Sequence, residues 1–299
     1  MSGMAMRLGA VETGGDKAGT FRFVFMPCVH FRFDLNSPEG LKAALAAVRK
    51  LDPEPEFILT GGDICHNLRD EPLESSQKRI AAFKEIWATG TDLPTLHCLG
   101  NHDLAAWNDK QAASDPLYGK GLLKKELDLA SSYHSFDRNG WHFVVLDYLK
   151  EEEPGRFSPE ISDEQLAWLK KDVAAHKEQP TILVNHAPFI AAFEAWSDRG
   201  IETEKGRIAP YGRVISNLPA VLTSIEGANV KALISGHLHT VEEIDYNGQR
   251  FICSGSVSGH QWNGPRLGFP EGFGVFDCRA DGTFDYAYQS YGWKAAKAL

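Results

Sequence analysis

The chain has 299 residues, of which 43% are hydrophobic and 24% charged, and its formal net charge is −9 at pH 7. This composition is typical of a globular protein and excludes disordered, coiled-coil and collagen-like chains. The acidic excess opposes sequence-independent binding to a polyanion, so we expect no stable nucleic-acid binding and no membrane anchor. The five cysteines are too few, and odd in number, for a disulfide framework, which favours a reducing, cytoplasmic compartment.

Residues 1–20 contain no apolar run long enough for a signal peptide or a membrane span, and we expect them to form a flexible tail. Residues 21–299 show no repeat, low-complexity linker or change in composition, which predicts a single domain. Within it, short β-rich runs alternate with longer helical runs, the pattern of a layered α/β fold.

The elements expected in chain order begin with a buried strand over 21–26 and a helix over 38–51, whose apolar residues recur at helical spacing. Ser162 and Gln165 have the spacing of a capping box and predict the start of a further helix. Weak periodicity over 103–125 and 188–211 indicates lids or substrate-contacting loops. The other expected elements are strands over 57–60, 93–99, 181–184 and 230–234, hairpins around 139–140 and 247–248, a helix over 214–225, and two strands within 273–288.

Polar side chains of the types that bind metals follow strand after strand. Because the carboxyl ends of strands meet at one edge of an α/β sheet, these side chains should share one crevice. Imidazole and carboxylate together suit zinc, iron or manganese, and there are more of them than one tetrahedral ion can use. The sequence therefore predicts a two-metal site. The residues concerned are Cys28, His30, Asp63, Asn101, His102, Asp103, His186, His237 and His239.

The order and spacing of these residues resemble the calcineurin-like metallophosphoesterases, whose pattern is Asp-x-His, Gly-Asp, Gly-Asn-His-Asp, a lone His and Gly-His-x-His. Four of the five blocks are present, and the block at 100–103 alone would recur by chance with a probability of about 10⁻⁵ per position. The resemblance implies a four-layer αββα sandwich with two mixed β-sheets flanked by helices. Within the family, the blocks at 100–103 and 236–239 look most like the branch of bacterial cyclic-nucleotide phosphodiesterases.

The resemblance also implies a role for each matching residue. His30 and His239 correspond to ligands of a first metal, and Asp63 to a carboxylate that bridges both ions. The ligands that it implies for the second metal are Asn101, His186 and His237. The cofactors would be two divalent or transition ions, manganese, iron or zinc.

His102 resembles the general acid that binds the phosphate and protonates the leaving oxygen, and Asp103 the residue that orients its imidazole. A hydroxide bridging the two metals would attack phosphorus. The expected substrate is a small-molecule phosphodiester or phosphomonoester. The alternative is a metal-binding module that has lost catalysis on the same scaffold.

Cys28 departs from the family pattern because it stands where the first ligand is normally Asp. As a thiolate it would bind a softer metal such as zinc or iron, and as a thiol it would be an inert buried side chain. Asp34, nearby in sequence, is a candidate substitute for the missing carboxylate.

The segment 253–264 after the last motif is rich in glycine and serine. Its His260 and Trp262 are candidate substrate-binding residues that would wall the pocket, although the segment could equally be a loop that closes the edge of the sandwich. His66 and His260 match no ligand position and are expected to be loop residues or substrate contacts. The remaining histidines, expected to be structural or on the surface, are His97, His134, His142 and His176.

Overall fold

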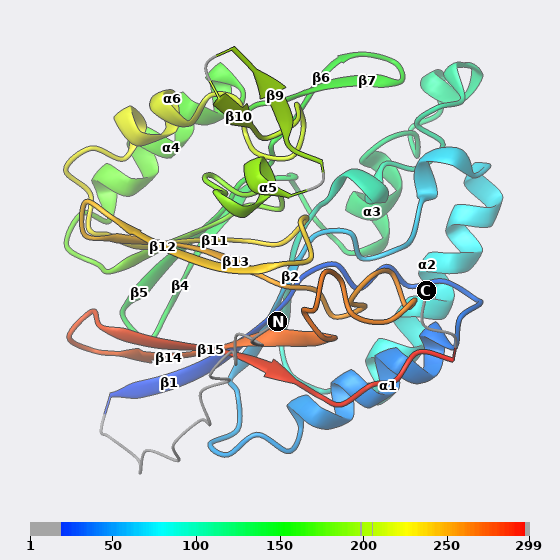
Figure 1. Ribbon diagram of the computed structural model, residues 1–299, viewed down its shortest axis with the longest axis horizontal. Coiled ribbons are helices and arrows are strands. Elements are labelled where there is room, and N and C mark those ends of the chain that lie inside the picture. The colour runs from blue at the N-terminus through cyan, green and yellow to red at the C-terminus, as the bar shows by residue number, and fades with distance from the viewer. Residues whose placement is uncertain (1–18, 198, 205, 297–299) are drawn as a thin grey trace.

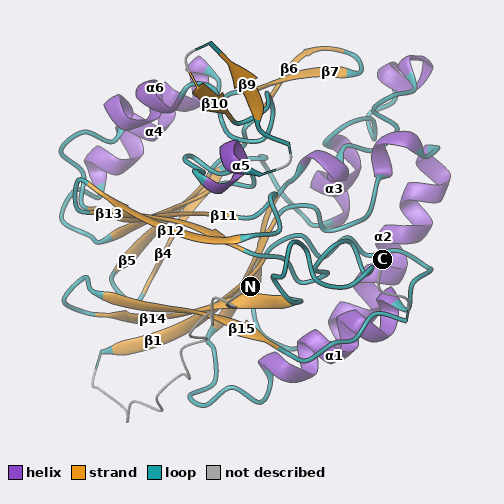
Figure 2. Cartoon of the chain, in the orientation of Figure 1, coloured by secondary structure: helices purple, strands orange, loops and turns teal. Residues whose placement is uncertain are grey.

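Two β-sheets face each other across the middle of the molecule, and helices cover their outer surfaces (Figures 1 and 2). The structure is a computed structural model that describes residues 19–296 except 198 and 205. Most of the predicted N-terminal tail, residues 1–18, lies outside the described residues. The described part contains no helix long and apolar enough to cross a membrane.

The first sheet has five strands in the order β15-β14-β1-β2-β3. β1 runs parallel to β2, and β2 to β3, while β14 is antiparallel to both β1 and β15. The helices α1 and α2 lie on its outer side (Figure 1). The bounds are Thr20–Met26 for β1, Ser37–Val48 for α1, Phe57–Gly61 for β2, Leu73–Gly90 for α2, Thr95–Cys98 for β3, Gly272–Arg279 for β14 and Phe284–Ser290 for β15.

The second sheet has six strands in the order β12-β13-β11-β8-β5-β4. Its central strands are parallel, and the two outermost pairs, β12·β13 and β4·β5, are antiparallel hairpins. The helices α4 and α6 cover its outer side (Figure 1). The bounds are His134–Arg138 for β4, Trp141–Val145 for β5, Asp163–Ala175 for α4, Thr181–Val184 for β8, Leu218–Ser224 for α6, Val230–Ser235 for β11, Val241–Tyr246 for β12 and Gln249–Ser254 for β13.

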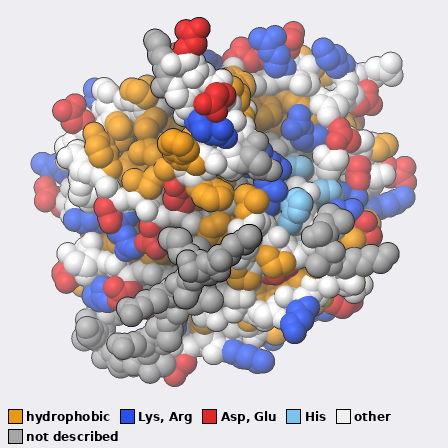
Figure 3. All heavy atoms as spheres, viewed as in Figure 1, with side chains coloured by type: hydrophobic (Ala, Val, Ile, Leu, Met, Phe, Trp, Pro, Cys, Tyr) orange, Lys and Arg blue, Asp and Glu red, His pale blue; other side chains and the backbone are white. Residues whose placement is uncertain are grey.

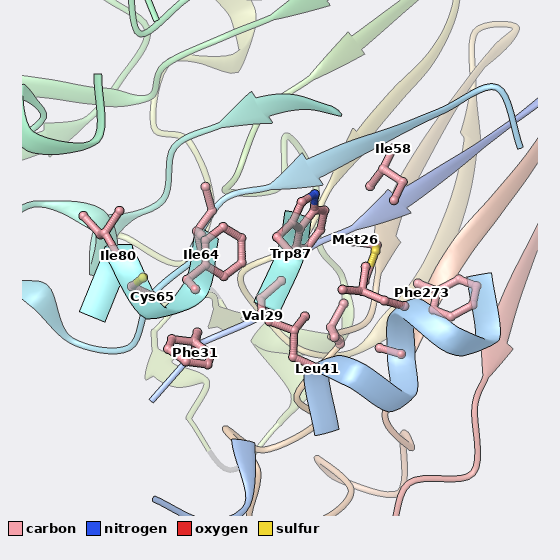
Figure 4. Packing of buried hydrophobic residues seen from close by; sticks show 14 of the residues in the cluster. Met26, Val29, Phe31, Leu41, Ile58, Ile64, Cys65, Ile80, Trp87 and Phe273 are labelled. Atoms are coloured by element: carbon pink, nitrogen blue, oxygen red, sulfur yellow. The ribbon is translucent and has the colours of Figure 1, made fainter. Parts of the chain in front are cut away.

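Successive side chains of β1 point to opposite faces of the sheet, so this one strand contributes to two hydrophobic cores. Phe23 and Phe25 point between the sheets, where the Phe23 ring stacks on Phe276 with centroids 4.7 Å apart and meets Phe143 edge-on at 5.3 Å. Val24 and Met26 point outward into the cluster beneath α1 and α2 (Figure 4). Each fully buried Phe contributes about 1.5–3 kcal/mol, so the two layers of packing fix the positions of the strand ends.

The structure differs from the predicted elements at several places. α2 was not predicted, because only one narrow stripe of it, at positions 76, 80, 83 and 87, is buried between charged residues. The predicted helix over 214–225 begins only at Leu218, directly before a proline. At α4, the Ser162 side chain accepts a hydrogen bond from the Gln165 amide as predicted, but the Gln165 side chain bonds the backbone of Asp147 instead of closing the capping box.

The two predicted lid regions contain short elements that the periodicity did not indicate. The region 103–125 holds the helix α3, and the region 188–211 holds the helix α5 and the hairpin β9-β10, while a further hairpin, β6-β7, lies between β5 and α4 (Figure 1). Their bounds are Gly121–Glu126 for α3, Leu149–Glu153 for β6, Arg156–Pro159 for β7, Phe193–Trp196 for α5, Ile201–Thr203 for β9 and Gly206–Ile208 for β10.

Candidate metal centre

The predicted ligands lie on loops that follow the carboxyl ends of β1, β2, β3, β8 and β11, where the two sheets meet. The loops after β1 and β2 are joined by backbone hydrogen bonds, from the Cys28 amide to Gly62 O at 2.9 Å and from the His30 amide to Asp63 O at 2.8 Å. Site residues on three of these loops have a left-handed backbone, which costs a non-glycine residue free energy and recurs at functional sites. They are Cys28, His30, Asp63, His237 and His239, with φ between 46° and 65°.

The Asp63 carboxylate lies at the centre of the site. Its Oδ2 is 3.4 Å from His30 Nε2 on one side and 3.1 Å from His186 Nε2 on the other. Its Oδ1 accepts a hydrogen bond from the His102 amide at 2.8 Å, which fixes the rotation of the carboxylate. One oxygen therefore faces two separate histidine groups, which is the position that a bridging ligand requires.

Each of these two groups contains a second histidine. His239 Nε2 is 3.1 Å from His30 Nε2, and His237 Nδ1 is 3.1 Å from His186 Nε2. Ligand atoms about 2.0–2.2 Å from one metal ion lie roughly 3 Å from each other. The ring nitrogens thus have the spacing of two coordination spheres that share Asp63.

In three of the histidines, a backbone carbonyl determines which ring nitrogen is unprotonated. A carbonyl only accepts hydrogen bonds, so the ring nitrogen beside it must carry the proton. In the neutral rings this leaves His186 Nε2, His237 Nδ1 and His239 Nε2 unprotonated and directed into the site. Hydrogen bonds of this kind orient metal-binding histidines in proteins. The acceptors for His186, His237 and His239 are the carbonyl oxygens of Gly61, Gly212 and Gly259.

The protonation states suit metal binding. Burial lowers the pKa of His30 and His237 well below the ordinary value, and it lowers that of His239 to about 3. Burial alone would raise the pKa of Asp63, but the imidazoles of His186 and His102 hold it well below its usual range. Burial alone would lower the pKa of His186, but the Asp63 carboxylate raises it. A cation bound here would displace that proton, because metal ligands must be deprotonated. The donor set, an ionised carboxylate between imidazole rings of which three are held on their far side by backbone carbonyls, therefore fits a metal centre.

Asn101 lies in the same cavity as these residues, and its Oδ1 accepts a hydrogen bond from the buried Tyr148 hydroxyl at 3.1 Å. The hydrogen bond holds the amide with its oxygen toward Tyr148. Nothing in the motif pattern pointed to Tyr148, because it lies beyond β5 and outside every block.

Cys28 has a place in both groups. Its sulfur lies within 4.8 Å of the ligand atoms of His30 and His239, and also of those of Asp63 and His186. It accepts a hydrogen bond from the His237 amide at 3.0 Å, and burial raises its pKa well above the ordinary value. The candidate substitute, Asp34, does not take this place, because it pairs with Arg32 and its side chain is 63% exposed.

The predicted role of Asp103 is also corrected. Its carboxylate accepts hydrogen bonds from the amides of Gly100 at 2.9 Å and Cys65 at 3.1 Å, so it holds the backbone of two loops together. The buried Nδ1 of His102 has no hydrogen-bond partner among the described residues. The His102 ring instead stacks on His66, with centroids 5.7 Å apart and planes 17° from parallel.

The two candidate substrate-binding residues of the segment 253–264 occupy different places in the structure. His260 lines the cavity over the metal centre, which has a volume of about 180 Å³. Trp262 does not: its ring is buried against Gly40 of α1, and its indole N–H donates to the carbonyl of His30 at 3.1 Å. Trp262 therefore supports the loop that carries His30 from behind and is not a pocket wall.

Comparison with known proteins places this site in a family. Residues 21–241 match the family model of the calcineurin-like phosphoesterases. The chain belongs to this family. The predicted family, the layered sandwich of two mixed sheets and the class of phosphoric ester hydrolase are thereby confirmed.

The individual relatives are named for two kinds of activity. The 3',5'-cyclic adenosine monophosphate phosphodiesterase CpdA of Escherichia coli K12 is 24% identical over 83% of this chain and 79% of its own length. The serine/threonine-protein phosphatase CPPED1 of Mus musculus is 25% identical over 72% of this chain and 63% of its own length. Among solved structures, a dimetal phosphatase from Danio rerio superposes with a TM-score of 0.62 at 15% identity, covering 91% of this chain and 96% of that chain. This last likeness concerns the fold.

Proposed function

We propose that this member of the family is a binuclear metal-dependent phosphoesterase that hydrolyses a small-molecule phosphodiester or phosphomonoester. The observation that carries the proposal is the position of Asp63 Oδ2 between two histidine pairs. Each pair offers imidazole nitrogens at coordination spacing, and the carboxylate between them would balance positive charge on both sides.

The two ion sites follow from the two groups. His30 and His239, with Cys28 as a thiolate, would hold the first ion, and Asp63 would be shared. The remaining ligands, those of the second ion, would be Asn101, His186 and His237. Imidazole, carboxylate and amide ligands suit manganese, iron or zinc, and the Cys28 sulfur shifts the first site toward zinc or iron. When bound, such ions lower the pKa of water and neutralise charge on phosphoryl oxygens.

In this proposal, His102 is the general acid. Its amide is tied to Asp63, which places its ring at the edge of the cavity beside His30, with centroids 4.8 Å apart. Stacking on His66 limits rotation of the ring. In this position the imidazole would bind a phosphoryl oxygen and donate a proton to the leaving oxygen, a contribution that is typically 10²- to 10⁴-fold.

The relatives leave the ester type open, since one is named a cyclic-nucleotide phosphodiesterase and another a protein phosphatase. The cavity of about 180 Å³ favours a small molecule over a folded partner. All five cysteines are free and buried, which fits a reducing compartment, and we propose that the protein acts in the cytoplasm.

The experiment is a panel of substrates and metals on the metal-depleted protein. Hydrolysis of bis(4-nitrophenyl) phosphate and 4-nitrophenyl phosphate is measured after reconstitution with manganese, iron(II) or zinc, together with metal content per chain. We expect two ions per chain and turnover with at least one metal. Two bound ions without turnover on either ester would favour the alternative, a metal-binding module that has lost catalysis.

A further inference from the structure

Three arginines from separate turns line the same cavity as the metal centre. Arg199 and Arg213 belong to the long connection between β8 and α6, and Arg266 to the loop between β13 and β14. In the space-filling view, blue side chains lie next to the pale blue histidines in the middle of this face (Figure 3). A protein with a net charge of −9 thus gathers cationic groups where the substrate must enter.

The positions of these arginines are built into the fold. Arg213 Nε donates to Glu194 Oε1 at 2.6 Å, and Glu194 is only 1% exposed, so a buried carboxylate anchors that guanidinium. Arg266 exchanges two backbone hydrogen bonds of 2.9 Å with Phe269, which closes its loop.

A fourth arginine holds the turn that carries Arg199. The guanidinium of Arg207, on β10, donates hydrogen bonds of 2.8–3.3 Å to three carbonyls on both sides of that turn. A turn held at three points presents its side chain at a defined place, as a binding residue requires. The acceptors are the carbonyl oxygens of Ala195, Ser197 and Gly200.

Exposure divides the lining of the cavity into an inner, largely buried half and an outer half whose residues are partly or fully exposed. The inner half contains Asp63 and the histidines of the metal centre. The outer half contains Arg199, Arg266 and His260, and the two arginines add to burial in lowering the pKa of His260. Among the described residues that line the cavity, Leu238 alone has an aliphatic or aromatic hydrocarbon side chain. Such a wall offers little area to an apolar leaving group.

We propose that the outer half, with Arg199 and Arg266, is a subsite for a second anionic group of the substrate, a phosphate or a carboxylate. Guanidinium groups bind such anions through paired, charge-assisted hydrogen bonds. This inference rests on the proposed function, in which the scissile phosphate occupies the inner half. It names the substrate class as phosphoesters that carry a further anion a few bonds away, in preference to esters with a neutral leaving group.

The first test compares matched pairs of substrates. ω-Carboxyalkyl phosphates and ω-carbamoylalkyl phosphates with two to five methylene groups have terminal groups of nearly the same shape that differ in charge. For at least one length we expect kcat/KM to be about tenfold or more higher for the carboxylate. The double variant R199Q/R266Q should reduce this ratio to near one.

The matched control is R156Q, which removes the same kind of charge from a side chain that is 70% exposed on the β6-β7 hairpin. It should keep the ratio of the parent protein. An equal kcat/KM for both members of every pair, or a ratio that R199Q/R266Q leaves unchanged, would overturn the subsite.

The second test measures binding without turnover. Isothermal titration of the metal-loaded protein compares phosphonocarboxylates with alkylphosphonates of the same length, and we expect about tenfold or more tighter binding of a phosphonocarboxylate that R199Q/R266Q abolishes. If no ester is hydrolysed but this difference is found, the proposed function fails and the subsite stands. If esters are hydrolysed without any charge preference, the subsite fails and the proposed function stands. Absence of both results contradicts both proposals.

Discussion

The second sheet carries a cluster of histidine and aspartate at each end, and the two clusters behave in opposite ways. His186 follows the end of β8 in the metal centre, whereas His142 is paired in register with Thr181 at the beginning of that strand. The second cluster, here called the His142 cluster, consists of Asp137, His142, Asp172 and His176. Three of its members are close enough together to bind an ion.

The two clusters differ in the hydrogen-bond partners of their histidine ring nitrogens. His142 makes hydrogen bonds of 2.8 Å through both ring nitrogens, to the carboxylates of Asp137 and Asp172. Only a protonated ring donates twice. Burial opposes this charge, but the hydrogen bonds to Asp172 and Asp137 raise the pKa of His142. The cluster is therefore satisfied without an ion.

The metal centre lacks this balance. His237 and His239 are each held by a backbone carbonyl on one side of the ring and face another imidazole, not a carboxylate, at 3.1 Å on the other side. Residue types alone thus do not distinguish a metal centre from a structural ion-pair network. The distinction comes from the hydrogen-bond partner of the other ring nitrogen, a backbone carbonyl for three histidines of the metal centre and a carboxylate for His142.

The largest effect is expected from D63N, which removes the charge that both groups share. Metal content should fall from two ions to one or none per chain, and turnover should fall by at least about 10³-fold. D172N in the His142 cluster is the matched control and should leave metal content unchanged. Metal analysis and steady-state hydrolysis check both variants. Retention of two ions by D63N would show that the carboxylate does not bridge them.

H102A should lower turnover about 10²- to 10⁴-fold for alkyl esters and much less for 4-nitrophenyl esters, since an activated leaving group needs little help from a proton donor. H176A, which changes a histidine of the His142 cluster, should affect both ester types equally and slightly. Steady-state hydrolysis rates of both variants on matched alkyl and aryl esters measure these losses. Equal losses in H102A on both esters would leave His102 without an acid role.

C28D should raise activity with manganese and weaken any preference for zinc or cadmium, because a carboxylate is a harder ligand than a thiolate. We expect a change of about tenfold or more in the ratio of manganese to zinc affinity. Competition binding of the two metals measures this ratio, with C28A as the control that removes the sulfur alone. If the parent, C28D and C28A have the same metal content, preference and turnover, Cys28 is an inert buried thiol.

A smaller effect, on stability, is expected from H142Q. Because the folded pKa of His142 is raised, its charge stabilises the fold below the unfolded pKa of about 6.5, and this contribution is lost as the pH rises through the folded value. The variant should lose about 1–3 kcal/mol at pH 6 and less at higher pH. Urea unfolding across this range measures it. A loss that does not change with pH would contradict the charged state of His142.

The sequence predicted the metal-binding blocks because each is a short motif at the end of a buried strand, where register fixes the direction of the side chains. It could not predict what Asp103 bonds, since its partners are amides on two loops that meet only in the fold. Trp262 was misplaced for a similar reason. Left-handed backbone at Gln261 and Trp262 turns the ring back into the core, and glycine-rich sequence does not specify such a turn.

The sequence indicated a lid or substrate-contacting loop over 188–211 but did not single out Arg199, and it gave no signal for Arg266. Arg199 lies in the region 188–211, whereas Arg266 lies outside both predicted regions, and only the tertiary arrangement brings the two to one cavity. His142 was expected to be structural or on the surface, and it is buried and structural, but its two carboxylate partners come from β4 and α4, which no local pattern links.

The most direct test of the two-metal centre is a crystal structure of the protein loaded with manganese, with anomalous scattering used to locate the ions. We expect two peaks about 3.5–4 Å apart on either side of the Asp63 carboxylate, and no peak between Asp137, His142 and His176. A single peak at Asp63, or an ion in the His142 cluster, would contradict the distinction drawn between the two sites.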